Sequence, residues 1–155
     1  MKKKIVIGAD HGGFELKQKL KSWLEKKDYV VTDVGVYSAE RADYPEIAAS
    51  VASLVSSGQI KEGILICSSG VGMSIAANRT MGVRASLCWD EKIAKHTREH
   101  NLSNILCLGA QNQSEEEARK IADAWLTTKH GKEPRYLKRV EMIDENTIPR
   151  CPGCF

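Results

Sequence analysis

Apolar residues along this chain follow two different spacings. Five short runs rich in apolar residues, many of them β-branched, have the length and composition of strands buried in a sheet. They cover residues 4–10, 29–35, 63–70, 83–88 and 104–109. Between these runs, apolar residues recur every three or four positions, which is the spacing of amphipathic helices. The predicted helices cover residues 14–27, 44–58, 71–79, 90–100 and 114–126.

Several residues mark the ends of these predicted helices. Pro45 lies in the first turn of the helix predicted at 44–58, and Gly58 follows its last turn. Both residue types are preferred at these positions. Ser114 precedes three glutamates and resembles an N-cap residue followed by a first turn whose negative charge suits the helix dipole.

The alternation of strands and helices predicts an α/β fold. We expect a three-layer, Rossmann-like, open and parallel five-stranded sheet with helices on both faces. One more helix, predicted at 134–144, has no strand after it, so we expect this extra C-terminal helix to pack on a neighbouring element or on a partner chain. The pattern predicts a single domain over residues 1–148, which includes the C-terminal helix, and a short tail at 149–155.

The amino-acid composition is that of an ordinary globular protein. Of the 155 residues, 42% are hydrophobic and 28% are charged, and the formal net charge is +3. The basic residues are dispersed, apart from MKKK at the start and KHGKEPRYLKR near the end, so charge does not indicate a nucleic-acid partner. No stretch approaches the roughly 18 to 20 apolar residues of a membrane span. The first apolar run ends at the acidic Asp10, whereas the core of a signal peptide would continue with apolar residues. We expect a cytoplasmic protein that binds neither nucleic acid nor membranes.

The five cysteines fall into two groups. Cys67, Cys88 and Cys107 end apolar runs, as small buried residues do, which favours a reducing compartment over a disulfide framework. Cys151 and Cys154 form C-P-G-C in the tail, a spacing that suits a metal site or a redox disulfide. A second cysteine pair for zinc is missing, and a redox motif would follow a βαβ pattern, so we interpret this tail as incidental.

Ligands of open parallel sheets bind beyond the carboxyl ends of the strands, where the strand order changes direction. This rule selects Asp10-His11-Gly12-Gly13 after the first predicted strand and Cys67-Ser68-Ser69-Gly70-Val71-Gly72 at the end of the third. His100 and Asn101 precede the last strand. They therefore start at the opposite edge of the sheet, unless a loop or a contact between two chains carries them across.

The segment 67–72 combines a thiol with the beginning of a helix. Unpaired N–H groups and the helix dipole favour an anion at such a position. The segment lacks the G-K-[ST] ending of a nucleotide phosphate loop, and it is not the G-x-G-x-x-G fingerprint of a first βα turn. The same positive helix end favours the thiolate of Cys67, which makes it a candidate nucleophile or base. A purely structural turn and an inert buried cysteine remain alternatives.

Asp10 and His11 are candidates beside this loop. An aspartate accepts a hydrogen bond from a sugar hydroxyl, and a histidine donates one to an anion. Either side chain could instead cap the first helix.

A second set of candidates comes from the last two predicted helices. His100 is a titratable donor beside the amide of Asn101. Arg135 and Arg139 are four residues apart, so a helix presents both guanidinium groups on one face, as a clamp for a phosphate dianion would require. A solvated pair of arginines is the alternative.

Together, these segments resemble type-B ribose-5-phosphate isomerases, in the superfamily that also includes galactose and allose phosphate isomerases. The resemblance covers residues 3–142 and is carried by GADHGGFELK, YPEIA, GILICSSGVGMSIAANR, REHN and the R-x-x-x-R-V pattern near the end. It implies the interconversion of ribose 5-phosphate and ribulose 5-phosphate in the pentose phosphate pathway, through a cis-enediolate and without a metal or organic cofactor. It also implies a homodimer, or a homotetramer, in which two chains build each active site.

The resemblance implies a role for each candidate residue. The implied catalytic residues are Cys67, as the base that moves a proton between C2 and C1, Ser69, as a proton relay between O1 and O2, and His100 with Asp10, which open the furanose ring. The implied binding residues are Ser68, Gly70, Val71 and Gly72 at the enediolate, Asn101 at a sugar oxygen, and His11, Arg135 and Arg139 at the phosphate.

This chain departs from the family pattern at several positions. Ser69 stands where threonine is usual, and Gln111 stands where many members have an arginine. Met73 occupies the position of the glutamate base in another branch, which favours Cys67 as the base here. The remaining hypotheses are a hexose 6-phosphate isomerase, such as one for allose 6-phosphate, and a sugar-phosphate-binding module without catalysis.

Overall fold

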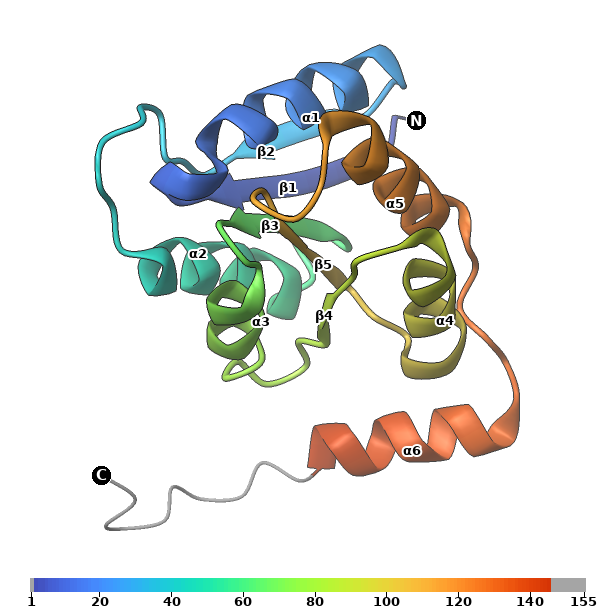
Figure 1. Ribbon diagram of the computed structural model, residues 1–155. Coiled ribbons are helices and arrows are strands. Elements are labelled where there is room, and N and C mark those ends of the chain that lie inside the picture. Colours follow the sequence, from blue (N-terminus) through green and yellow to red (C-terminus); the bar gives the residue numbers. More distant parts are fainter. Residues whose placement is uncertain (1, 146–155) are drawn as a thin grey trace, which may run out of the picture.

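The computed structural model describes residues 2–145 and contains one five-stranded parallel sheet (Figure 1). Its strands are β1 (Lys4–Ala9), β2 (Val30–Asp33), β3 (Gly63–Cys67), β4 (Ala85–Leu87) and β5 (Ile105–Gly109). They are arranged in the order β2-β1-β3-β5-β4. All five predicted strands are confirmed, and the last strand in sequence lies inside the sheet, between β3 and β4.

Helices cover both faces of the sheet, as predicted. One face is covered by α1 (Phe14–Lys26), α4 (Glu91–Asn101) and α5 (Glu115–Thr127), and the other by α2 (Tyr44–Ser56) and α3 (Val71–Ala77). A short 3₁₀ helix, η1 (His11–Gly13), joins β1 to α1. The sequence pattern did not predict η1, because a single turn is too short to produce a hydrophobic period.

The three inner strands, β1, β3 and β5, contribute to two separate cores. Ile64 and Ile66 of β3 pack beneath α1 and α5, whereas Leu65 and Cys67 of the same strand pack beneath α2 and α3. Every residue of β3 is buried. Successive side chains of a strand point to opposite faces, so a strand covered on both sides must be apolar at every position.

The helix ends follow the signals in the sequence. The Ser114 hydroxyl accepts a hydrogen bond from the N–H of Glu117, and the Glu117 carboxylate accepts one from the N–H of Ser114, which forms a capping box at α5. Gly58 follows α2 with a φ of +74°, in the left-handed region that glycine adopts without strain.

The C-terminal helix α6 (Pro134–Glu145) lies beside α4, below the sheet in Figure 1. Its buried residues are Tyr136 and Val140. Near its other end, Asp144 pairs with Arg84 at 2.9 Å. The expectation that this helix packs on a neighbouring element is confirmed within the chain itself. The C-P-G-C tail lies outside the described residues.

None of the helices in residues 2–145 is long and apolar enough to cross a membrane.

Candidate active site

The carboxyl ends of β1 and β3 form the centre of the candidate site. From β1 the chain first adds β2 on one side, and it later adds β3 on the other, so the strand order changes direction between β1 and β3. Asp10 and His11 directly follow β1, and Cys67 is the last residue of β3. The N–H of Asp10 donates to the carbonyl of Ile66 at 3.3 Å, which holds the two strand ends together.

Four glycines allow the segments around Cys67 to approach one another. A Cβ atom on Gly12 would collide with the Ser68 hydroxyl, and one on Gly13 would lie 2.5 Å from the carbonyl oxygen of Ile66. On the other side, a Cβ on Gly109 would lie 2.7 Å from the carbonyl oxygen of Ser69. Gly70 has a φ of +77° and faces the backbone of β5. The loop that follows Cys67 is therefore enclosed between η1 and the end of β5.

Hydrogen bonds occupy the carbonyl groups of this loop and leave several of its N–H groups free. The carbonyls of Cys67 and Ser68 accept from the N–H groups of Ala110 (2.9 Å) and Gln111 (3.0 Å). Within the part of the chain that the structure describes, the N–H groups of Ser68, Ser69 and Gly72 donate to no acceptor. These N–H groups are free to donate hydrogen bonds to an anion, and the positive end of the α3 dipole lies at the same place.

The Cys67 thiol lies at the edge of this group of N–H donors. Its Sγ accepts a hydrogen bond from the N–H of Gly70 at 3.1 Å, and 5% of the residue is exposed. This contact and the enclosing loop fix the direction in which the sulfur points. The geometry therefore suits a group that gains and loses a proton beside a developing negative charge.

The other two buried thiols have no comparable environment. Burial raises the pKa of Cys88 to about 11. Burial also raises the pKa of Cys107, which is wholly enclosed, well above its ordinary value. Both thiols therefore stay protonated near neutral pH, as the interpretation of these cysteines as small buried residues predicts.

Asp10 and His11 are held by backbone groups. Oδ1 of Asp10 accepts from the N–H of Gly13 at 3.1 Å, so the capping role suggested by the sequence is realised at η1. Nδ1 of His11 accepts from the N–H of Ala42 at 3.4 Å. In the neutral ring, this contact leaves the proton on Nε2, which becomes the donor available to a ligand.

Tyr44 is a site residue that residue-by-residue reasoning missed. Its ring lies against the loop, because a Cβ on Gly72 would be 2.8 Å from the ring carbons. Tyr44 is 40% exposed and begins α2. The YPEIA motif contained this residue, but only the fold shows that it reaches the loop.

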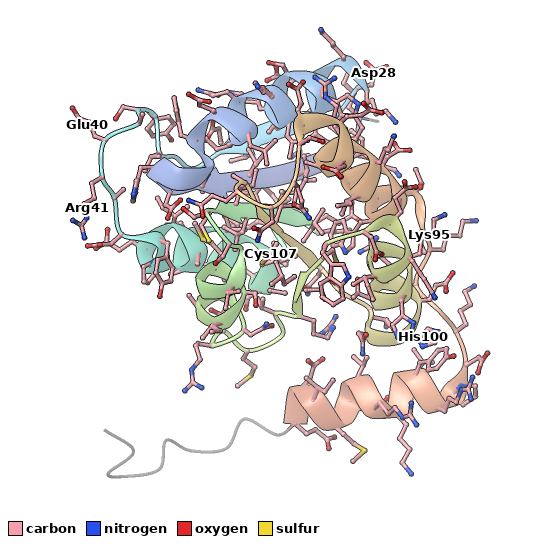
Figure 2. The ribbon with its side chains drawn as sticks, in the orientation of Figure 1. Asp28, Glu40, Arg41, Lys95, His100 and Cys107 are labelled. Carbon is pink, nitrogen blue, oxygen red and sulfur yellow. The ribbon has the colours of Figure 1, made fainter. Side chains whose placement is uncertain are left out.

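The second set of predicted residues lies elsewhere in the chain. His100 and Asn101 end α4, which begins at the carboxyl edge of the sheet and runs to the opposite edge, and Figure 2 shows His100 at the end nearest α6. Arg135 and Arg139 lie on α6. A single chain therefore brings Asp10, His11 and residues 67–72 together, and separately His100 with Arg135, but it does not join the two groups.

A family model described as Ribose/Galactose Isomerase matches residues 5–143. The chain belongs to this family. The resemblance seen in the sequence motifs is thereby confirmed, and the ribose/galactose isomerase match covers both groups of candidate residues.

Individual relatives in the ribose/galactose isomerase family agree with this assignment. Ribose-5-phosphate isomerase B of Escherichia coli (strain K12) is 43% identical over 141 residues, which are 91% of this chain and 94% of that protein. Ribose-5-phosphate isomerase B of Clostridium thermocellum superposes with a TM-score of 0.90 at 42% identity, covering 92% of this chain and 95% of that one. The enzyme of Mycoplasma genitalium, solved with bound ribulose-5-phosphate, superposes with a TM-score of 0.88 at 37% identity, covering 94% and 96%. The predicted α/β fold is confirmed by these structures.

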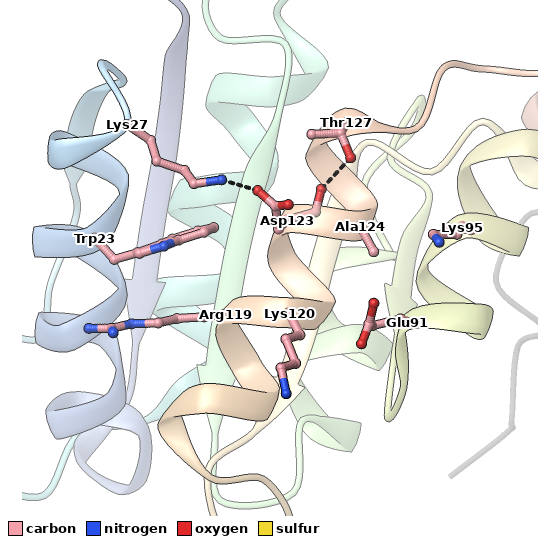
Figure 3. A pocket seen from close by; sticks show the side chains of 9 residues that line it. All are labelled: Trp23, Lys27, Glu91, Lys95, Arg119, Lys120, Asp123, Ala124 and Thr127. Carbon is pink, nitrogen blue, oxygen red and sulfur yellow. Dashed lines mark hydrogen bonds and ion pairs between the residues drawn. The ribbon is translucent and has the colours of Figure 1, made fainter.

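A depression elsewhere on this ribose/galactose isomerase contains none of the predicted site residues. It has a volume of about 350 Å³, and Figure 3 shows Trp23, Lys27 and Asp123 among the residues that line it. Its basic groups are largely neutralised, since Lys27 pairs with Asp123, Arg119 with Glu115 and Lys120 with Glu116. The depression therefore offers little free charge to a sugar phosphate.

Proposed function

We propose that this chain interconverts ribose 5-phosphate and ribulose 5-phosphate by proton transfer at Cys67. The observation that carries the proposal is the Cys67 thiol at the edge of a loop in which, among the residues that the structure describes, the N–H groups of Ser68, Ser69 and Gly72 have no acceptor. Several relatives are named ribose-5-phosphate isomerase B, and one of them was solved with bound ribulose-5-phosphate. The reaction requires no metal or organic cofactor, because a thiolate removes the proton and backbone donors stabilise the charge.

The reaction balances with the groups at this site. The Cys67 thiolate takes the proton from C2 of the open aldose, and the electrons move to O1 to give a cis-enediolate. Ser68, Ser69 and Gly72 donate to its oxygens through the unpartnered N–H groups, and Gly70 and Val71 complete the loop. Ser69 carries a proton from O2 to O1, and the Cys67 thiol returns its proton to C1, which regenerates the thiolate. Donors placed where charge develops lower the barrier most, because they bind the enediolate more strongly than the sugar.

Phosphate binding and ring opening fall to residues in both groups. His11 lies beside the loop and offers its Nε2 donor, and Arg135 and Arg139 supply two cationic donors for the phosphate. His100, assisted by Asp10, opens the furanose ring, and Asn101 binds a sugar oxygen. Because these groups lie apart in one chain, the proposal requires a second copy that brings His100, Asn101 and the arginines to the first copy's Cys67.

A homodimer, alone or paired into a homotetramer, is therefore part of the proposal. Its support is the set of large apolar side chains exposed on α3, in the segment after it and on α6: Val71, Ile75, Met81, Leu137, Met142 and Ile143. Burial of such side chains against a partner would provide the hydrophobic free energy of association. We place this homodimer in the cytoplasm and in pentose phosphate metabolism, in line with the composition and with the reactions for which its relatives are named.

The proposal is tested by following ribose 5-phosphate in D₂O by NMR. The wild-type protein is expected to form ribulose 5-phosphate and to exchange the C2 proton. Cys67→Ala is expected to lose at least roughly 10² in rate, the contribution typical of a general base, while the protein stays folded. Cys88→Ala removes another buried thiol and is expected to keep its activity. Near-normal turnover by Cys67→Ala would sink the assignment of the base.

The same assay separates the other two hypotheses. Faster turnover of allose 6-phosphate than of ribose 5-phosphate would identify a hexose 6-phosphate isomerase, a change to which the neutral Gln111 could contribute. Binding of ribose 5-phosphate without any exchange would identify a non-catalytic sugar-phosphate-binding module.

A further inference from the structure

Tyr136 contacts two residues that the proposed reaction uses in different steps. Its ring stacks on the imidazole of His100, with centroids 4.2 Å apart and planes inclined by 20°. Its hydroxyl accepts a hydrogen bond from Nη2 of Arg135 at 2.9 Å, and the Arg135 guanidinium lies 4.8 Å from the ring centroid. Within residues 2–145, no other residue contacts both His100 and Arg135 in this way.

The surroundings of Tyr136 hold its ring in one place. It is 8% exposed, although both neighbours in α6 are exposed. The N–H of Gly131 donates to the carbonyl of Glu99 at 3.1 Å, and a Cβ on Gly131 would collide with that oxygen. This close approach brings the start of α6 against the last turn of α4, so the tyrosine ring has little freedom to move.

His100 is in contact with a second ring as well. The imidazole of His96 lies near it, with centroids 3.9 Å apart and planes inclined by 40°. A histidine in the last turn of a surface helix would otherwise sample several side-chain rotamers. Contact with both His96 and Tyr136 restricts this choice and favours one direction of the imidazole.

Arg135 is held at two of its three guanidinium nitrogens. The side chain is 64% exposed, and its Nε also pairs with Glu133 at 2.8 Å. With Nη2 on the Tyr136 hydroxyl, the plane of the guanidinium is fixed while other N–H groups remain available to a phosphate. An arginine whose plane is fixed in advance loses less entropy when it binds an anion.

We propose that Tyr136 is a positioning residue that holds the imidazole of His100 for ring opening and the guanidinium of Arg135 for phosphate binding. The inference rests on the proposed function, since it assigns Tyr136 through the roles of those two residues. The ring serves His100 and the hydroxyl serves Arg135, so the two contributions are separable by substitution.

The two sugars distinguish ring opening from proton transfer. Ribose 5-phosphate is mainly a furanose, which must open before C2 can lose its proton. Ribulose 5-phosphate has its carbonyl at C2 and a phosphate ester on O5, so it cannot close a furanose ring. Exchange of its C1 protons with D₂O therefore requires Cys67 and the loop but no ring opening.

Two substitutions test the proposal. Tyr136→Leu is expected to lower kcat with ribose 5-phosphate roughly three- to ten-fold, the range typical of an aromatic pair, and to leave C1 exchange of ribulose 5-phosphate within about two-fold of wild type. Tyr136→Phe keeps the stacked ring, so its kcat is expected to equal that of the wild type. Both variants lose the hydrogen bond to Arg135, so KM for ribose 5-phosphate is expected to rise roughly two- to ten-fold in each.

The outcomes separate this inference from the proposed function. If Tyr136→Leu lowers kcat and C1 exchange by the same factor, the residue is only structural and the inference is overturned. If the buried position does not tolerate leucine, Tyr136→Phe decides, and an unchanged KM overturns the Arg135 role. Absence of both turnover and exchange in the wild-type protein would instead contradict the proposed function.

Discussion

Gly70 occupies the position where the backbone of the Cys67 loop is most constrained, and we expect Gly70→Ala to damage both stability and catalysis. Its φ of +77° lies in the left-handed region, which costs a residue with a side chain about 1–2 kcal/mol. An alanine Cβ would also lie 2.5 Å from Cδ1 of Leu87 and 2.9 Å from the carbonyl carbon of Leu108. Forcing atoms into a packed site adds about 1–3 kcal/mol. The expected loss is therefore about 2–5 kcal/mol.

Gly58→Ala is the matched control for this prediction. Gly58 has nearly the same φ, +74°, but a Cβ there would have no atom within 4 Å. It should lose only the conformational term of about 1–2 kcal/mol. Urea denaturation followed by circular dichroism measures both free energies of unfolding, and the difference between the variants isolates the contacts of the added Cβ with Leu87 of β4 and Leu108 of β5.

Catalysis should separate the two glycine variants further. The N–H of Gly70 donates to Sγ of Cys67 at 3.1 Å, so any shift that relieves the contact with β5 also moves the donors around the thiol. Loss of a single donor to a developing oxyanion costs roughly 10²–10³ in kcat, so we expect a fall of about ten-fold or more from partial displacement. Gly58→Ala should keep wild-type kcat. Equal stability of the two variants, or wild-type kcat in Gly70→Ala, would refute the reasoning.

Three further predictions concern charges and thiols. Lys17 is fully buried, with Nζ 2.7 Å from both carboxylate oxygens of Asp33. Lys17→Met leaves a buried carboxylate without this partner, so the free energy of unfolding in urea should fall by about 3–5 kcal/mol. The double variant Lys17→Met/Asp33→Leu should recover much of this loss, and an additive loss would contradict the pairing. In a Cys151→Ser/Cys154→Ser background, iodoacetamide at about pH 8 should modify Cys67 alone, as detected by peptide mass spectrometry. Cys88, with a pKa of about 11, and Cys107, with a pKa well above its ordinary value, stay protonated at that pH. Equal labelling of Cys88 would contradict this prediction. Arg139→Ala should mainly raise KM for ribose 5-phosphate, because a phosphate contact acts in ground and transition states alike, and a large fall in kcat at constant KM would contradict that role.

Local patterns predicted most of the secondary structure of this protein. The apolar runs at β3 and β5 identify strands buried on both faces, because alternate residues must meet two different cores. Ser114 and Gly58 mark helix ends through hydrogen bonds and backbone angles that depend on a few neighbouring residues. These features are visible in the sequence because the interactions that cause them are local.

The same locality explains which part of the candidate site was predicted. Asp10 and Cys67 lie at strand ends, and the carboxyl ends of parallel strands share one edge, so the sequence order is enough to bring them together. The separation of His100 from Cys67 also follows from the direction of α4, which the order of the elements implies.

Other features depended on contacts between segments far apart in the chain. The position of β5 between β3 and β4, the burial of Lys17 against Asp33 and the contact of Tyr44 with Gly72 leave no local pattern in the sequence. The stacking of Tyr136 on His100 is of the same kind, since it depends on how α6 docks on α4. The sequence by itself determined the elements and the edge of the sheet where the thiol and its loop lie. Only the tertiary structure decided which side chains meet there. Each such contact depends on how elements far apart in the chain pack together, and such packing leaves no local pattern of apolar and polar residues in the sequence.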